Sequence, residues 1–315
     1  KTFLELVDMG IEESGLGDPE SRQNKRFKIR GVLRDALRAK SVGIIEELPE
    51  KGIVKYAKPV GIIGALIPTT NPDLTPAGQA VYGIKARDVL IFSPHPRAKQ
   101  ATIETARIAL ETAVKYGAPK DIIGWIDEPS VELSRELMAN ADLILATGGP
   151  GMVKAAYSSG TPAIGVGAGN TPVVIDKSAD IKMTANYILM SKTFDNGVIC
   201  ATEQSVIIDK EIYDKVRNEF LNRGAYILNE EELDKVREVL FKNGSLNADI
   251  VGKSAYIIAS MAGFEIPKNS KVLIGEVTST GMEEPFAHEK LSPVLAMYKA
   301  KTFDEAIAKA ERLVA

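Results

Sequence analysis

The sequence predicts an α/β protein in which a parallel sheet carries helices on both faces. Short apolar runs recur along the chain, and segments with apolar residues at helical spacing lie between most of them. Polar or glycine-rich turns close several of the runs. A strand that helices cover on both faces is apolar along its whole length, so short continuous runs indicate a parallel sheet.

The N-terminal part begins with helix. Apolar residues recur there at helical spacing, at Phe27, Ile29, Val32, Leu33, Ala36 and Leu37. Strands are then expected at residues 53–56, 60–67, 89–92, 122–126, 143–146 and 173–175. One helix between these strands places its apolar residues on a single face, at Ile103, Ala106, Leu110 and Ala113.

A second α/β unit is expected to begin around residues 193–200. Its strands are predicted at residues 205–208, 272–274 and 294–297. Its helices are predicted around residues 212–220, 233–240 and 303–313. No repeat or low-complexity linker marks the boundary between the two units.

The composition excludes several classes of protein. The chain has 315 residues, of which 45% are hydrophobic and 26% charged, which is ordinary for a globular protein of two domains. A net charge of -3 argues against a nucleic-acid partner. We expect no membrane partner and no signal peptide, because no apolar run is long enough and the N-terminus lacks the required pattern. The cytoplasm is therefore the simplest location, and we expect the chain to begin and end within a larger fold.

Cys200 is the only cysteine of the chain, which excludes an internal disulfide and a cysteine-rich metal site. A lone cysteine is most often a small buried hydrophobe. Here it follows the turn-forming residues Asp195, Asn196 and Gly197, and loops often present reactive groups to a cleft. A thiolate attacks aldehydes readily and forms a thioester after oxidation, so Cys200 is a candidate nucleophile.

His288 is one of two histidines and lies in the segment EPFAHEKLSP. A surface or capping role is the commoner outcome for such a residue. A neutral imidazole can also take a proton from a thiol near pH 7, so His288 is a candidate acid/base group.

Turns at the ends of predicted strands indicate a binding edge. The segment ATGGPGMV at residues 146–153 follows one apolar run and opens a helix, and we expect residues 164–170 to form another glycine-rich turn. In an open parallel sheet, ligands bind outside the carboxyl ends of the strands. Pro68, Ser93, Gly148 and Gly167 are expected at such ends, which favours a nucleotide or another ligand with a phosphate. The segment GVGAG alone is not a complete dinucleotide fingerprint.

Several motifs resemble one family closely from about Lys55 to the end of the chain. They are IPTTNP, IFSPHPRAK, IIGWID, LATGGPGMVKAAYSSG, SKTFDNGVICA and PFAHEKLSP. They are similar to the acylating acetaldehyde dehydrogenases, which include the aldehyde dehydrogenase half of bifunctional aldehyde-alcohol dehydrogenases. The segments GDPESR and RFKIRG, before Lys55, look more like the acylating sulfoacetaldehyde dehydrogenases.

This resemblance implies the aldehyde dehydrogenase fold, with a Rossmann-like nucleotide-binding domain, an α/β catalytic domain and a small oligomerisation arm. We assign residues 1–190 to the NAD-binding domain and residues 191–315 to the catalytic domain. The rest of the catalytic domain is expected beyond this chain. The resemblance also implies a homo-oligomer, a dimer or higher.

By position in the matching motifs, Cys200 corresponds to the nucleophile and His288 to a histidine of the acylating members. Either Thr70 or Asn71 supplies the oxyanion donor. A gapless match between Pro68 and Pro72 favours Thr70, whereas residue type favours Asn71. The implied cofactor-binding residues are Thr69, Ser93, His95, Gly148, Gly149, Val153, Gly167 and Glu289, the last of which contacts the nicotinamide ribose.

Two departures from the hydrolytic aldehyde dehydrogenases matter. Aligned on Pro172, Val166 stands where those enzymes carry a glutamate general base, and an apolar side chain cannot activate water. Ser93 and Pro96 replace the lysine and glutamate that grip the adenine ribose. The cofactor is thus expected to be NAD, the family default, with NADP left open.

The predicted reaction is reversible oxidation of a short aldehyde, acetaldehyde first, to an acyl-CoA. A thioester on Cys200 carries the acyl group, and coenzyme A is the co-substrate. The alternatives are an acylating sulfoacetaldehyde dehydrogenase and a non-acylating enzyme, against which Val166 argues. A non-catalytic assembly unit or a plain nucleotide-binding module would have no need of Cys200, His288 and Glu289 together.

Overall fold

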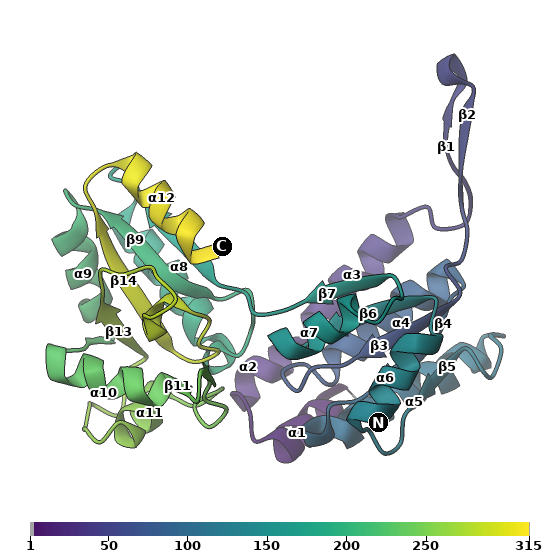
Figure 1. The fold of residues 1–315 in the computed structure, drawn as a ribbon, viewed down its shortest axis with the longest axis horizontal. Helices are drawn as coiled ribbons and strands as arrows, with labels where there is room; N and C mark the ends of the chain where they lie inside the picture. The colour runs from purple at the N-terminus through teal and green to yellow at the C-terminus, as the bar shows by residue number, and fades with distance from the viewer. Residues whose placement is uncertain (1–2, 315) are drawn as a thin grey trace. The chain divides into compact units, whose positions relative to one another are not determined.

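A computed structural model describes residues 3–314, and the chain divides into two compact units (Figure 1). We call residues 3–15 and 22–168 the first unit, and residues 16–21 and 169–314 the second unit. The sequence-based boundary at residue 190 lies later than this division. The segment before residue 190 groups with the second unit because β8 (Thr171–Ile175) pairs with β9 (Glu203–Asp209). The assignment of cofactor binding to one domain and catalysis to the other stays a prediction.

The first unit is built on a parallel sheet with the strand order β5-β4-β3-β6-β7. Its strands are β3 (Ile62–Leu66), β4 (Val89–Ser93), β5 (Ile123–Trp125), β6 (Leu143–Thr147) and β7 (Ala163–Val166). The chain runs outward from β3 through β4 to β5, then returns to β6 on the other side of β3. The direction of winding therefore reverses between β3 and β6, which is where open α/β sheets bind ligands.

Helices cover both faces of this sheet (Figure 1). Apolar side chains of α4 (Leu74–Ala86) and α5 (Lys99–Lys115) pack with alternate strand residues such as Ala65 and Phe92. The opposite strand residues, such as Leu66, pack against α6 (Val131–Asn140) and α7 (Pro150–Tyr157). Three further helices precede the sheet: α1 (Phe3–Ser14), α2 (Pro19–Asn24) and α3 (Arg26–Arg38).

A two-stranded antiparallel hairpin protrudes from the first unit (Figure 1). It consists of β1 (Gly43–Leu48) and β2 (Ile53–Ala57), joined by a short 3-10 turn at Pro49–Lys51. Gly52 has a φ of 64°, the left-handed region that glycine adopts without strain, so it can close this turn.

The second unit also has a parallel sheet, with the order β10-β13-β14-β9-β8. The remaining strands are β10 (Ala225–Ile227), β13 (Val272–Glu276) and β14 (Val294–Ala300). Its helices are α8 (Ile181–Thr193), α9 (Tyr213–Asn222), α10 (Glu230–Leu240), α11 (Ala255–Met261) and α12 (Phe303–Val314). Helices α8 and α9 pack on one face, and α10, α11 and α12 on the other. A short hairpin of β11 (Phe241–Lys242) and β12 (Ser245–Leu246) follows α10.

The predicted α/β class, with parallel sheets and helices on both faces, is confirmed. The expected glycine-rich turn at residues 164–170 is wrong in its first half, because Ala163–Val166 form strand β7. This strand position requires a glycine, because a Cβ added at Gly165 would lie 2.7 Å from Val153 and 2.8 Å from the Tyr157 ring, both on α7. Within residues 3–314, no helix combines the length and the apolar composition needed to cross a membrane.

Candidate active site

The residues of the predicted binding edge lie along one edge of the sheet of the first unit. Pro68 and Gly148 follow β3 and β6, Ser93 ends β4, and Gly167 follows β7. These four positions therefore lie at carboxyl ends of parallel strands, as predicted. Two of the strands, β3 and β6, flank the point where the winding reverses.

The turn at Thr69–Asn71 joins β3 to the helix α4. All three side chains are half-buried. The Lys25 ammonium donates a hydrogen bond to Asn71 Oδ1 over 2.9 Å, and the Arg22 guanidinium donates to the Thr70 carbonyl over 3.3 Å. The turn that carries both oxyanion candidates is thus held by two cationic side chains.

Ser93 and His95 lie in the loop that follows β4. Ser93 is buried, and its hydroxyl lies 3.0 Å from that of Ser134 on α6. His95 is exposed, and its Nδ1 accepts a hydrogen bond from the backbone N–H of Arg97. Ser93 therefore links the strand end to α6, whereas His95 caps the next turn of the chain.

The glycine-rich segment after β6 opens α7, as predicted. Gly149 is the N-cap residue, and Pro150 occupies the first helical position. A Cβ built at Gly149 or Gly151 meets no atom within 4 Å, so this helix end faces open space. A helix N-terminus carries a partial positive charge and backbone N–H groups, which suit a phosphate.

A pocket of about 210 Å³ lies between α6 and α7. It is lined by Val131, Ser134, Arg135, Met138, Gly151, Met152 and Ala155. It adjoins the open N-terminus of α7, and Ser134 connects it to Ser93. We take the strand ends, the open end of α7 and this pocket together as the candidate cofactor site of the first unit.

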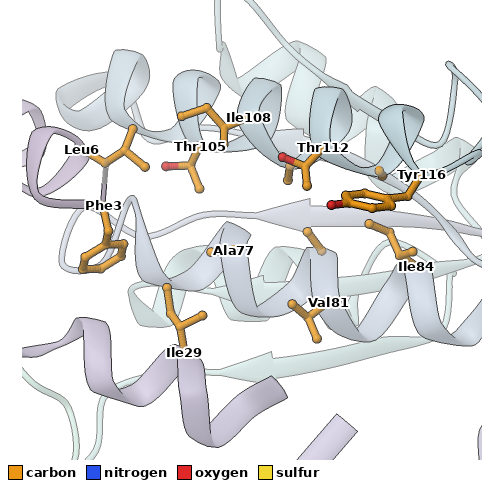
Figure 2. Close-up of a pocket in the computed structure, with 13 residues that line it drawn as sticks. Phe3, Leu6, Ile29, Ala77, Val81, Ile84, Thr105, Ile108, Thr112 and Tyr116 are labelled. Atoms are coloured by element: carbon orange, nitrogen blue, oxygen red, sulfur yellow. The ribbon is translucent and has the colours of Figure 1, made fainter. Parts of the chain in front are cut away.

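A larger pocket of about 410 Å³ lies among helices of the first unit and is distinct from this edge (Figure 2). Its walls are almost wholly apolar, with Leu6 from α1, Ile29 from α3, Val81 from α4 and Ile108 from α5. Its lining, which lies within residues 3–116, contains none of the predicted site residues.

Cys200 lies in the loop between α8 and β9, and its side chain is exposed. This excludes the alternative that the thiol is a buried core residue. The preceding residues Asp195, Asn196 and Gly197 all have positive φ, of 53°, 49° and 73°. Asp and Asn adopt this region more readily than other side chains, but two of them in succession still cost strain, and strain of this kind clusters at active sites.

Buried contacts hold this strained loop. Asp195 is fully buried and its Oδ1 accepts the backbone N–H of Asp18 over 2.8 Å. Asn196 donates to the carbonyl of Gly252 over 3.1 Å. A Cβ at Gly197 would lie 2.7 Å from the Ser292 carbonyl, so only glycine allows this approach.

Glu289 lies beside the nucleophile loop through Gly169. The Gly169 N–H donates to Glu289 Oε1 over 3.1 Å, and a Cβ at Gly169 would lie 2.6 Å from the Cys200 carbonyl oxygen. Burial raises the pKa of the Glu289 carboxyl, and the Gly169 hydrogen bond opposes this shift. Glu289 and the backbone of Cys200 therefore share one corner of the second unit.

Two buried lysines support this corner. Lys192, at the end of α8, donates to Gln204 Oε1 over 3.0 Å, and the Lys290 N–H donates to the same oxygen over 3.1 Å. Lys290 Nζ in turn donates to the carbonyls of Phe286 and His288 over 2.7 and 2.6 Å. Burial lowers the pKa of Lys192 to about 7, against the opposing effect of Glu203 and Glu289.

His288 is half-buried, and its ring lies 5.2 Å from that of Phe241. Its Nε2 is 2.9 Å from the Met282 carbonyl oxygen. A carbonyl oxygen only accepts, so Nε2 is the donor in this contact and Nδ1 is the ring nitrogen left to accept a proton. Glu284 anchors the start of this segment through two hydrogen bonds from Arg237, of 3.0 and 2.7 Å.

Val166 ends β7, and 48% of its surface is exposed. Its side chain is therefore not buried in the core, although the residue belongs to a strand. Its carbonyl accepts the N–H of Gly148, which places it beside the glycine turn of the candidate cofactor site.

These features define a two-unit α/β protein with a candidate nucleotide site in one unit and an exposed cysteine in the other. Residues 26–237 match the aldehyde dehydrogenase family, and the chain belongs to that family. The chain is 57% identical to an aldehyde-alcohol dehydrogenase of Clostridium acetobutylicum and 42% identical to a sulfoacetaldehyde dehydrogenase of an Acholeplasma species. It covers 36% of the first relative and 66% of the second, each with 99% of its own length.

Solved structures of acylating members have the same fold. An acetylating aldehyde dehydrogenase from Geobacillus thermoglucosidasius superposes with a TM-score of 0.94 at 47% identity, over 99% of this chain and 70% of that one. A propionaldehyde dehydrogenase from Rhodopseudomonas palustris, solved with bound CoA and an acylated cysteine, gives 0.85 at 31% identity, over 98% and 71%. The predicted resemblance to the acylating aldehyde dehydrogenases is confirmed.

Sequence reasoning missed the residues that support the candidate site. Lys25, Lys192, Gln204 and Lys290 are buried, although lysine and glutamine usually indicate solvent exposure. The pocket residue Arg135 lies on an amphipathic helix and was also missed. The sequence signal that could have found this pocket is that α6 directly precedes, and α7 directly follows, the same interior strand, β6.

Proposed function

We propose that this chain is part of an enzyme that oxidises a short aldehyde and transfers the acyl group to coenzyme A. The observation that carries this proposal is Cys200, exposed on a strained loop whose backbone is anchored by buried groups. A rigid loop holds a nucleophile at one position and lowers the entropic cost of reaching the transition state.

In the proposed reaction, the Cys200 thiolate adds to the aldehyde carbon and forms a carbon–sulfur bond. The carbonyl oxygen becomes an oxyanion, which hydrogen-bond donors must stabilise. The resemblance nominates Asn71 or Thr70 together with the backbone N–H of Cys200 as these donors. After oxidation the acyl group remains on Cys200 as a thioester.

The second half of the reaction releases the acyl group. The thiolate of coenzyme A attacks the thioester carbon, its bond to the acyl group forms, and the bond to Cys200 breaks. We assign the proton of the coenzyme A thiol to Nδ1 of His288, because Nε2 already donates to Met282. A structural relative binds CoA and carries an acylated cysteine, which supports this order of steps.

The cofactor is proposed to be NAD, with NADP as the alternative. A bound nicotinamide cofactor would accept the hydride that leaves the aldehyde carbon. The residues of the first unit fit such a group, since Gly149, next to Gly148 in the glycine turn, faces open space at the N-terminus of α7. We assign the remaining contacts to Thr69, Ser93, His95, Val153, Gly167 and Glu289. NADP is the alternative because Arg135, in the adjacent pocket, would pair with the 2′-phosphate that distinguishes NADP from NAD.

Val166 supports the acylating over the hydrolytic reaction. It stands where hydrolytic relatives are expected to carry a carboxylate, and its side chain cannot take a proton from water. The thioester would then persist until coenzyme A arrives. We therefore place a non-acylating dehydrogenase second.

The aldehyde is proposed to be acetaldehyde. The higher identity to an aldehyde-alcohol dehydrogenase, 57% against 42% for the sulfoacetaldehyde enzyme, favours it. The direction of flux in the cell follows the supply of substrates, and the proposed chemistry is reversible.

One assay tests the function directly. Full-length protein is incubated with NAD and either acetaldehyde or sulfoacetaldehyde, with and without coenzyme A, and NADH is followed. We expect sustained turnover with acetaldehyde only when coenzyme A is present, and at most slow turnover after the first cycle without it. Sustained turnover without coenzyme A, with free acid as the product, would contradict the acylating assignment.

We further propose that the hairpin β1–β2 is the oligomerisation arm and that its partner is a second copy of the chain. Its exposed residues include the apolar side chains of Ile44, Val54 and Tyr56. A two-stranded sheet also has two open edges, which favours pairing with another chain. Replacing these three residues with serine should lower the molecular mass measured by sedimentation, whereas an unchanged mass would exclude this arm.

A further inference from the structure

The turn between β3 and α4 contains two candidates for the oxyanion donor, and its hydrogen bonds distinguish them. Lys25 follows α2, is 2% exposed, and directs its ammonium at the side chain of Asn71. The distance from Lys25 Nζ to Asn71 Oδ1 is 2.9 Å. An ammonium only donates hydrogen bonds and an amide oxygen only accepts them, so this contact determines which way the amide faces.

The other half of the amide is then available as a donor. With Oδ1 bound to Lys25, the Asn71 Nδ2 group lies on the opposite branch of the planar amide. Its contact within the turn is a long one of 3.5 Å to the Thr70 hydroxyl. One N–H of Asn71 at most is used in that contact, because an amide nitrogen has two.

Thr70 is held in a different way. Its carbonyl accepts a hydrogen bond of 3.3 Å from Arg22, and its hydroxyl is the acceptor for Asn71. The Thr70 hydroxyl keeps its own proton, but it can rotate, whereas the Asn71 amide has its direction fixed by a charged partner.

We propose that Lys25 is a positioning residue that orients the amide of Asn71, so that Asn71 Nδ2–H and not the Thr70 hydroxyl donates to the oxyanion. This deepens the proposed function and rests on it. A donor whose direction is set before the reaction costs no reorganisation when charge develops on the substrate oxygen. The nearby ammonium also adds positive potential at the amide, which further favours a developing negative charge.

The test is a double-mutant cycle on the full-length enzyme, because Lys25 has further contacts that a single substitution would also remove. The variants are Lys25→Met, Asn71→Ala and the pair. We expect Asn71→Ala to lower kcat on the order of 10²–10³-fold with little change in KM, as for loss of an oxyanion donor. Lys25→Met should lower kcat about 10-fold or more, and the pair should be no worse than Asn71→Ala alone.

A second variant separates donation from folding. Asn71→Asp keeps the shape and would pair with the Lys25 ammonium, but a carboxylate has no N–H to donate. It should fold as the wild type does and lose as much kcat as Asn71→Ala. Thr70→Ala, which keeps the backbone carbonyl that binds Arg22, should cost much less kcat than Asn71→Asp. Lys28→Met, at an exposed lysine of the same region, is the charge-matched control and should be neutral.

The outcomes separate the two proposals. Losses that multiply in the Lys25 and Asn71 pair, in an enzyme that still acylates Cys200, would overturn the positioning role and leave the proposed function intact. A larger loss from Thr70→Ala than from Asn71→Asp would overturn the choice of donor. Wild-type protein that acquires no acyl group on Cys200 from an acyl-CoA would overturn both proposals.

Discussion

The two parallel sheets place their candidate site residues at opposite ends of their strands. In the first unit, the turn at residues 69–71 and the glycines at 148 and 149 follow the carboxyl ends of β3 and β6. In the second unit, Gly169, Cys200 and the segment at residues 284–293 precede the amino ends of β8, β9 and β14. The same architecture therefore presents two chemically different edges.

The difference follows from helix polarity. In a parallel α/β sheet the carboxyl ends of strands meet helix N-termini, where backbone N–H groups and positive dipole ends suit anionic ligands. The amino ends meet helix C-termini, which offer carbonyl groups instead. The second unit supplies cations and amides from side chains there. Lys192, in the last turn of α8, donates to Gln204 Oε1, which also accepts the backbone N–H of Lys290.

The largest expected effect concerns the edge that carries the nucleophile. We expect Cys200→Ala to abolish covalent labelling by an acyl-CoA, because it is the only thiol of the chain, while cofactor binding to the first unit is retained. Intact mass spectrometry measures the acyl adduct, and fluorescence titration measures cofactor affinity. An adduct that survives in the variant would mean that another group carries the acyl chain.

A second prediction concerns the proton at the same edge. His288→Ala should slow the CoA-dependent step on the order of 10²–10⁴-fold, since its Nδ1 is the proposed base. The first turnover of NADH, which precedes that step, should be affected less. Stopped-flow bursts compared with steady-state rates measure both. Equal losses in the two measurements would assign His288 to structure or general positioning.

The third prediction tests the anion-binding edge. Gly149 has φ −65° and ψ 164° with open space around it, so Gly149→Asp should fold and cap α7. The added carboxylate would lie close to the phosphates of a cofactor bound at this helix end and should repel them. We therefore expect the Kd for the cofactor to rise on the order of 10–100-fold. Labelling of Cys200 by acyl-CoA should not change. Gly149→Asn is the neutral control, and equal effects of the two variants would exclude a charge mechanism.

The smallest expected effect is on stability, and it concerns the buried Lys192 at the edge of the second unit. The folded-state pKa of Lys192, about 7, lies below its ordinary value of 10.5. The unfolded chain therefore binds more protons between these values, so this group makes the wild type more stable as pH rises through that window.

Lys192→Met should lose that dependence. We expect its Tm relative to wild type to fall by several degrees between pH 6.5 and pH 9.5, on the scale of a few kcal/mol for a chain of this size. Scanning fluorimetry at both pH values measures the change, with the exposed Lys182 of the same helix replaced by Met as the control. Parallel curves for wild type and Lys192→Met would show that Lys192 does not titrate in this range.

Helices and strands could be predicted where burial imposes a clear pattern of apolar residues along the sequence. The helix at Arg26–Arg38 and the strands at Val89–Ser93 and Val294–Ala300 lie close to their predicted positions. The strand at Ala163–Val166 was missed because it alternates between half-buried and exposed residues and contains a glycine. From the sequence alone, Gly165 indicates a turn. The structure shows that it is a strand residue against which α7 packs closely.

The local sequence was sufficient to nominate Cys200, His288 and the glycines that open α7, because turn chemistry and residue type are local properties. The sequence also determined the α/β class and membership of the aldehyde dehydrogenase family. It left open whether Thr70 or Asn71 is the donor, since both polar residues occupy the same turn.

Only the tertiary structure decided which distant residues hold that chemistry in place. It joins Lys25 to Asn71 across 46 residues and Gly169 to Glu289 across 120. It also assigns residues 16–21 to the second unit, where the backbone N–H of Asp18 donates a hydrogen bond to the Asp195 carboxylate. The physical reason is that a buried cation or carboxylate is stable only beside a partner, and no periodicity along the chain reveals which partner the fold supplies.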